Sequence, residues 1–225
     1  MTLGPGTTWK DTPKPRIRFD IDKQNCVITY KVLVQLLFKG KWTEARKIAF
    51  RNKLKIAIES TFNSTNFKIK PKNKKDKDGN CCPCPNGFSP KVKISFVPDG
   101  QWSTDEDWEA DVHANPTKKP MQSSNLGKWA DLDEDDLRPQ PKPSSAPGVT
   151  QLPAVHEFGH FIGLDHPGVG VAGDEYKHKG KDRNGNDVDG GHDLMGGGNQ
   201  VRPFYFDKWK NKLNSKNSGC SYETK

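Results

Sequence analysis

Alternating apolar and polar residues predict a strand early in the chain. From residue 28 to residue 38 every even position is apolar, and a period of two is typical of a strand with one buried face. These positions are Ile28, Tyr30, Val32, Val34, Leu36 and Phe38. Lys39-Gly40 ends the strand, and Thr43 can then cap a helix that runs to about Phe62. One stripe of that helix is apolar: Phe50, Leu54, Ala57, Ile58 and Phe62.

Further strands are predicted in the middle of the chain. A short one lies around Phe67–Ile69, and clearer alternation marks Val92–Phe96 and Trp108–Val112, the last of which is stopped by Pro116. Residues 116–148 are rich in Pro, Ser and Asp, so we expect a long surface loop there.

Two helices are predicted in the last third of the chain. The first starts near Thr150, has Pro153 in its first turn and stops at Gly163. Residues 167–193 are rich in Gly, Asp and Lys and are expected to be irregular, and a last helix covers about Phe206–Leu213. This order of strands and helices predicts an α+β fold.

Composition and charge narrow the function classes. The chain has 225 residues, 32% of them hydrophobic, and no apolar run approaches the ~20 residues of a membrane span. The net charge is +8, but the basic residues are dispersed, an acidic run at 131–136 offsets them, and no nucleic-acid motif accompanies them. We therefore expect a solvated basic surface and no nucleic-acid partner. No signal peptide is visible in residues 1–20, so a leader has been removed or export uses another route.

The five cysteines leave two interpretations open. They are Cys26, Cys81, Cys82, Cys84 and Cys220. Two disulfides and one spare thiol would suit an oxidising compartment, whereas a cysteine-rich zinc loop would need a second CxxC pair that the chain lacks. We expect at least one disulfide that involves Cys81, Cys82 or Cys84, and the pairing stays open.

The most specific chemistry lies in the segment from His156 to His166. His156 and His160 are four residues apart, so a helix presents both imidazoles on one face to one ion. Glu157 can reach a metal-bound water, and Gly163 allows the chain to turn back and bring His166 as a third ligand. Two histidines on a helix can be plain polar surface, but five residues at fixed offsets favour a catalytic zinc site.

This segment resembles the extended zinc signature of the metzincin metallopeptidases. Asp193-Leu194-Met195-Gly196 is similar to the Met-turn of that family, in which the methionine forms an apolar floor beneath the ligand imidazoles. The resemblance implies a twisted mixed sheet packed on two helices, with the zinc helix at the base of the cleft and a small irregular C-terminal subdomain ending in a helix. It also implies that the strand Trp108–Asn115 binds peptide backbone by strand addition.

The resemblance also divides the chain. Residues 1–20, broken by three prolines, would be an extended leader, residues 21–166 the catalytic subdomain with the zinc helix, and residues 167–225 the subdomain with the Met-turn and the final helix. Some metzincins have a tyrosine two residues after the methionine, and here that position is Gly197. Tyr176 and Tyr205 are the candidate transition-state donors in its place.

Two looser patterns complete the picture. Oxygen-bearing side chains alternate from Asp182 to Asp189, which fits a calcium loop or a polar turn equally well. The pieces Asp174-Glu175-Tyr176 and Val201-Arg202-Pro203 resemble peptidase domains of bacterial polymorphic toxins. That resemblance implies a secreted effector, delivered outside the producing cell, with an inhibitor or immunity protein as a partner.

Together these patterns predict a zinc-dependent endopeptidase that acts on a protein or peptide substrate through a zinc-bound water activated by Glu157. The alternative is a zinc-containing protein-binding module without proteolytic activity. The intact Glu157 argues against this alternative, because binding alone needs no general base.

Overall fold

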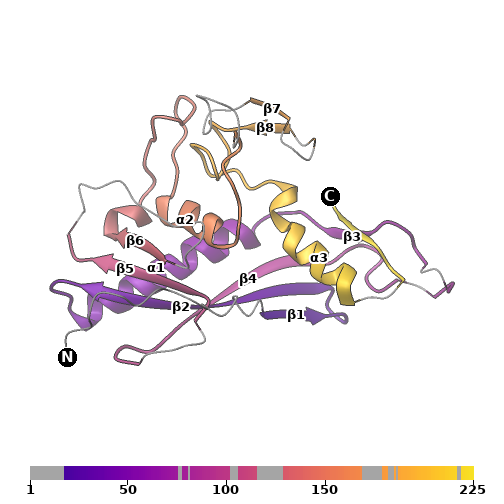
Figure 1. Ribbon diagram of the computed structural model, residues 1–225, viewed down its shortest axis with the longest axis horizontal. Coiled ribbons are helices and arrows are strands. Elements are labelled where there is room, and N and C mark those ends of the chain that lie inside the picture. The colour runs from indigo at the N-terminus through magenta and orange to yellow at the C-terminus, as the bar shows by residue number, and fades with distance from the viewer. Residues whose placement is uncertain are drawn as a thin grey trace, which may run out of the picture.

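The computed structural model describes residues 18–75, 78–80, 82–101, 106–115, 129–168, 179–181, 185, 187–216 and 219–225. Its elements follow the chain in this order: β1 (Arg18–Asp22), β2 (Val27–Lys39), α1 (Glu44–Asn63), β3 (Ile69–Pro71), β4 (Ser89–Phe96), β5 (Trp108–His113), β6 (Trp129–Asp133), the 3-10 helix η1 (Glu134–Leu137), α2 (Pro153–Phe161), β7 (Lys179–Lys181), β8 (Asp187–Asp189), the 3-10 helix η2 (Pro203–Phe206), α3 (Asp207–Lys216) and β9 (Tyr222–Thr224). The fold is therefore α+β, as predicted (Figure 1).

Strand β2 organises the main sheet. Its 13 residues are long enough to pair with three other strands. Its first part, from Val27, pairs antiparallel with β1 and parallel with β4, whereas its last part, Val34–Lys39, pairs parallel with β5. Strand β6 then pairs parallel with β5, which completes a mixed five-stranded sheet among the described residues.

Helices α1 and α2 share the hydrophobic core with one face of this sheet. The even residues of β2 are buried together with the apolar stripe of α1, as the sequence pattern predicts, except that Phe38 and Ala57 are only partly buried. The ring of Trp108 on β5 lies 5.8 Å from that of Phe158 on α2, and Phe62 at the end of α1 lies 5.5 Å from the same ring. Each fully buried side chain of this kind stabilises the fold by about 1.5–3 kcal/mol. The core thus holds α2 against both α1 and β5.

Several predicted boundaries are confirmed. The strand predicted at residues 28–38 is β2, and the side chain of Thr43 caps α1 by accepting a hydrogen bond from Arg46 N. The strands predicted at 92–96 and 108–112 are β4 and β5. The helix predicted to stop at Gly163 is α2, and Gly163 has the positive φ of +81° that ends it.

The prediction of one long loop over residues 116–148 is wrong in part, because this range contains β6 and η1. Strand β5 is consequently hydrogen-bonded to β2 along one edge and to β6 along the other. The prediction that Trp108–Asn115 binds peptide by strand addition is therefore also wrong, since the backbone groups of this strand are already paired. Only Ala130 and Leu132 give β6 an apolar face, so the acidic residues around them hid the strand.

The C-terminal part of the chain also differs from expectation. Residues 167–193 contain the β7–β8 hairpin, which lies at the top of Figure 1, on the far side of α2 from the sheet. The chain does not end in a helix, because β9 follows α3 and pairs antiparallel with β3. Strand β1 begins at Arg18, inside the segment predicted as a leader, and residues 1–17 lie outside the described part of the chain.

Two disulfides tie the loop after β3 to distant parts of the chain. Cys84 is bonded to Cys26 and Cys82 to Cys220, which confirms the prediction that this cysteine cluster forms a disulfide. The alternative of a zinc loop loses two of its ligands to these bonds. Cys81 lies outside the described residues. Two disulfides are compatible with an oxidising, extracellular environment.

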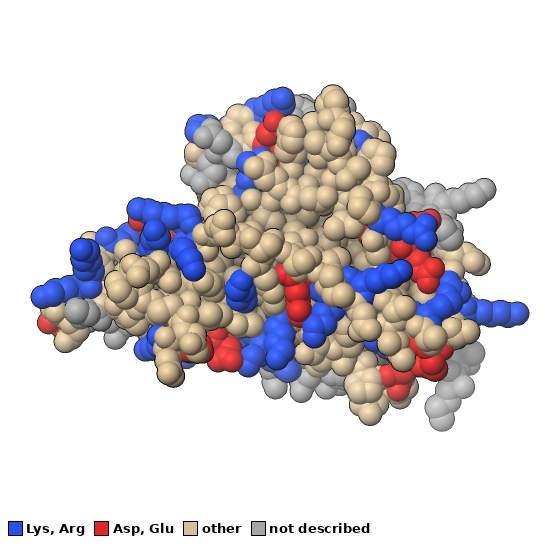
Figure 2. Space-filling view, turned by 180° about the vertical axis from the view of Figure 1, so that it is seen from behind, with Lys and Arg blue, Asp and Glu red and all other residues tan. Residues whose placement is uncertain are grey.

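The described surface and helices bear on the expected partners. No described helix has both the length and the apolar character needed to cross a bilayer. Figure 2 shows one face on which Lys and Arg side chains are interleaved with Asp and Glu across the lower part, while the upper middle is largely uncharged. The positive net charge is thus dispersed on this face.

Candidate metal centre

Helix α2 presents the first two histidines of the predicted site. It begins with Pro153, whose missing N–H is no loss in a first turn, and every residue from Pro153 to His160 is buried. The helix ends where Gly163 N donates to His160 O over 2.8 Å and Leu164 N donates to Gly159 O over 2.9 Å. This left-handed turn brings His166 back toward the helix.

The structure brings the three predicted histidines together. One ring nitrogen of each lies within 4.8 Å of those of the other two. His156 and His160 are 6% and 8% exposed, and their Nε2 atoms are 3.1 Å apart. The ring of His166 lies 4.6 Å from that of His160 and 5.4 Å from that of His156.

Hydrogen bonds to backbone carbonyls fix the state of two of these rings. His156 Nδ1 lies 2.8 Å from Leu194 O, and His160 Nδ1 lies 3.0 Å from Leu164 O. A carbonyl oxygen only accepts, so each Nδ1 carries a proton, and in the neutral form of either ring Nε2 then has the lone pair that a metal can take. Burial, and after it the neighbouring His160, lowers the pKa of His156 to about 3, which keeps this ring neutral.

These rings fit a tetrahedral zinc ion. Bonds of 2.0–2.1 Å to zinc place two ligand nitrogens about 3.3 Å apart, close to the observed 3.1 Å between the two Nε2 atoms. Two neutral nitrogens whose lone pairs face each other at this distance repel unless a cation lies between them. Three imidazoles can thus hold a metal ion, and their softness suits zinc among other transition ions.

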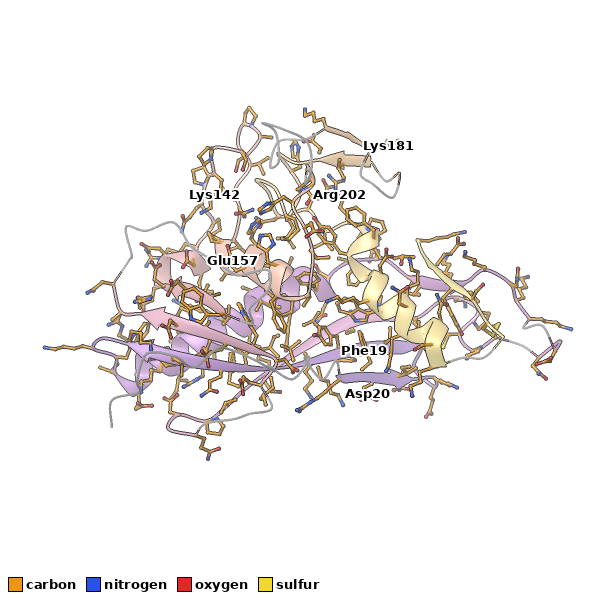
Figure 3. The ribbon with its side chains drawn as sticks, viewed as in Figure 1. Phe19, Asp20, Lys142, Glu157, Lys181 and Arg202 are labelled. Atoms are coloured by element: carbon orange, nitrogen blue, oxygen red, sulfur yellow. A yellow bond between two sulfur atoms is a disulfide. The ribbon has the colours of Figure 1, made fainter. Side chains whose placement is uncertain are left out.

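Glu157 follows His156 on α2 and is 7% exposed. Figure 3 shows it on the helix, with Lys142 and Arg202 on the loops above. The pKa of Asp136 in η1 is raised to about 7. Burial is the main cause, and the negative charge of Glu157 makes a smaller contribution in the same direction. The predicted base therefore lies on the histidine helix, near enough to η1 to act on Asp136, in a largely desolvated setting.

Met195 lies against α2 at Gly159. A Cβ atom at Gly159 would lie only 2.2 Å from Met195 Sδ, so the thioether packs beside the turn that carries His160. The buried carboxylate of Asp193 holds the Met195 segment, accepting hydrogen bonds from Met195 N at 2.8 Å, from Arg202 Nε at 3.0 Å and from the Tyr205 hydroxyl. Met195 thus packs against α2 next to His160, and its role as a floor beneath the imidazoles stays a prediction.

Of the two predicted transition-state donors, only Tyr205 lies in the described part of the chain. Tyr205 is buried and donates its only hydroxyl proton to Asp193, so the geometry does not support its role as a donor to substrate. Burial raises the pKa of Tyr205 well above its usual value. Tyr176 lies outside the described residues. No side chain fits at Gly197, because a Cβ there would lie 2.4 Å from the backbone of Ser144 and Ser145.

Sequence reasoning missed the residues that support the site. Gln151, two residues before α2, has its Nε2 atom 3.0 Å from His156 Nδ1, 3.2 Å from Leu194 O and 2.7 Å from Gly196 O. Nothing in the local pattern marks Gln151. For the contact between α2 and Met195 the sequence offers one signal, the glycine at position 159, because a glycine inside a helix often indicates close packing.

Two other candidate sites have less support. Asp111, His113 and Asp131 also bring ligand atoms within 4.8 Å, on the sheet face opposite α2. Their groups already have partners: His113 Nε2 lies 2.9 Å from Asp131 Oδ1, and Asp111 forms an ion pair with Lys39 at 3.2 Å. Most of the predicted calcium loop at 182–189 lies outside the described residues.

Comparisons of the chain with models of protein families, with curated proteins and with solved structures found no match.

Proposed function

We propose that this protein is a zinc-dependent endopeptidase. The observation that carries the proposal is the convergence of three imidazoles, two of which have their Nδ1 protons fixed by carbonyls and their Nε2 lone pairs turned toward one point. Three neutral histidines leave one coordination position open, which is typical of catalytic rather than structural zinc. The resemblance to the metzincin signature supports the same proposal.

A zinc ion held by these imidazoles would supply a Lewis acid that makes a water molecule more acidic and polarises a carbonyl. Glu157 accepts the proton of the attacking water as its oxygen bonds to the scissile carbonyl carbon. The same carboxylate then returns the proton to the departing nitrogen as the C–N bond breaks. His156, His160 and His166 would hold the metal throughout.

The burial of Glu157 favours catalysis over binding alone. A carboxylate that is 7% exposed carries a desolvation cost, and a zinc-containing binding module would have no need of it. The two disulfides support export to an oxidising environment. We include in the proposal a protein or peptide substrate and, from the looser toxin resemblance, an inhibitor or immunity protein that covers this site.

The test is Glu157→Gln, measured for zinc content and for single-turnover cleavage of casein or gelatin with and without a chelator. Glutamine is nearly isosteric, so we expect about one zinc per chain and a 10²–10⁴-fold loss of cleavage. Glu44→Gln, on the exposed start of α1, is the matched control and should cleave like the parent. Zinc-loaded Glu157→Gln that cleaves within tenfold of the parent would exclude Glu157 as the base. A parent that binds zinc and cleaves nothing favours the binding module.

A further inference from the structure

We propose that Gln151 is a positioning residue for the first zinc ligand: its side-chain amide holds the carbonyls of Leu194 and Gly196 and so fixes the tautomer and place of His156. This inference rests on the proposed zinc site and deepens it.

The location of Gln151 is itself tightly held. Its side chain is buried, with 3% of the residue exposed, and its backbone exchanges two hydrogen bonds of 2.8 Å with Gln140. On either side, Asn199 bonds the same segment to the Met195 region, donating to Thr150 O at 2.7 Å and accepting from Leu152 N at 2.9 Å. Gln151 therefore reaches the Met195 segment from a fixed point just before α2.

The donors and acceptors around Gln151 fit one arrangement when His156 carries its proton on Nδ1. Nε2 lies within reach of two carbonyl oxygens, Gly196 O at 2.7 Å and Leu194 O at 3.2 Å, and its two N–H groups can serve both. The reversed amide would place Oε1 against the same two oxygens and is excluded by repulsion. Leu194 O has a second lone pair, which accepts the Nδ1 proton of His156 at 2.8 Å.

This arrangement decides which nitrogen of His156 faces the metal. The NH₂ group of Gln151, 3.0 Å from Nδ1, can only donate and therefore cannot take the Nδ1 proton. The Leu194 carbonyl can take it, and it stays beneath the ring because Gln151 holds it there. Without the amide, two buried carbonyls lose a donor and the turn is free to shift. The imidazole can then move its proton to Nε2, where it blocks the lone pair that binds zinc.

The experiment compares Gln151→Leu and Gln151→Met with the parent and with Gln35→Leu. Gln35 is also buried, at 4% exposure, but its Nε2 donates to Gln101 O, away from the histidines, so its loss controls for the loss of a buried amide. Two variants of Gln151 are made because either one can fail to fold. Zinc dissociation constants come from chelator competition, and ring tautomers come from ¹⁵N spectra of the metal-free proteins.

We expect both variants at 151 to bind zinc 10–100-fold more weakly than the parent, in line with the usual effect of residues that orient a ligand. Their metal-free spectra should show His156 as a mixture of tautomers, whereas Gln35→Leu keeps the single Nδ1-protonated form. An affinity within twofold of the parent, or an unchanged single tautomer, would overturn the inference. A parent that binds zinc but cleaves no peptide overturns the proposed function and leaves this inference standing.

Discussion

Gly159 is the position at which helix propensity and packing predict opposite effects of one methyl group. Within a helix, Gly→Ala ordinarily raises the free energy of unfolding by about 0.5–1 kcal/mol, because alanine loses less backbone entropy on folding. At position 159 the added Cβ would lie 2.2 Å from Met195 Sδ and 3.1 Å from its Cε, whereas carbon and sulfur atoms in contact need about 3.5–4 Å. The sulfur must therefore move by more than an ångström.

Met195 has little room for that movement. It is fully buried, and its backbone N–H is held by Asp193 at 2.8 Å. Adding a methyl group to a packed core typically costs about 1–3 kcal/mol. After the gain in helix propensity is subtracted, about 0–2.5 kcal/mol remains, and because the sulfur must move by more than an ångström we expect Gly159→Ala to lower the free energy of unfolding by an amount near the upper end of that range.

Urea denaturation of the metal-free protein, with its disulfides intact and followed by circular dichroism, measures this effect without the contribution of zinc binding. The matched background is Met195→Ala, which by itself should cost about 2–5 kcal/mol. In the Met195→Ala background the thioether is absent, so Gly159→Ala should raise the free energy of unfolding by the ordinary helix-propensity value. If Gly159→Ala stabilises the protein even with Met195 in place, the packing argument is wrong.

Two further predictions concern the disulfides and the buried titratable groups. A thiol titration of denatured but unreduced protein should detect one free thiol out of five cysteines, and five free thiols would contradict the pairing. Replacing both Cys26 and Cys84 by Ser should lower the free energy of unfolding, measured in urea, by up to about 4 kcal/mol, because that bond closes a loop of 58 residues. In metal-free protein the lowered pKa of His156 (about 3) makes stability fall as the pH drops from about 6.5, because the unfolded chain takes up the proton first. The raised pKa of Asp136 (about 7) has the opposite effect: stability falls as the pH rises from about 3.8, because the unfolded chain loses the proton first. Asp136→Asn removes only the second effect, so between pH 4 and 7 the free energy of unfolding of this variant should rise with pH more steeply than that of the parent. The two slopes should differ by at most about 1.4 kcal/mol per pH unit. Equal slopes in urea denaturation would refute the assignment.

The parts of the structure that the sequence predicts well are local. The offsets of His156, Glu157 and His160 are spacings within one helix, and Thr43 caps α1 through a bond to a residue three positions on. Period and capping carry this information directly, so both could be predicted without the fold.

The parts that the sequence did not predict depend on contacts between distant segments. Gln151 meets Leu194 O across 43 residues, and no periodicity marks such a contact. Strand β6 has only two buried apolar residues, and its pairing with β5 decides that β5 is not an edge strand. The disulfide partners likewise follow from where the sheet places Cys26 and where α3 places Cys220, which an odd count of cysteines cannot indicate.

The pairing of β2 with later strands and the pairing of the cysteines determine which contacts can form first while the chain is being synthesised. As the chain emerges from its N-terminus, β2 must wait for β4 and β5, so the sheet cannot close on its early residues alone. During the same interval Cys26 meets three cysteines within four positions, only one of which is its native partner, while Cys220 has not yet been made. A bond from Cys26 to Cys81 or Cys82 has to be exchanged before the native pair forms. Vectorial synthesis thus favours mispaired intermediates, and the yield of folded protein should depend on a disulfide isomerase or a thiol–disulfide buffer.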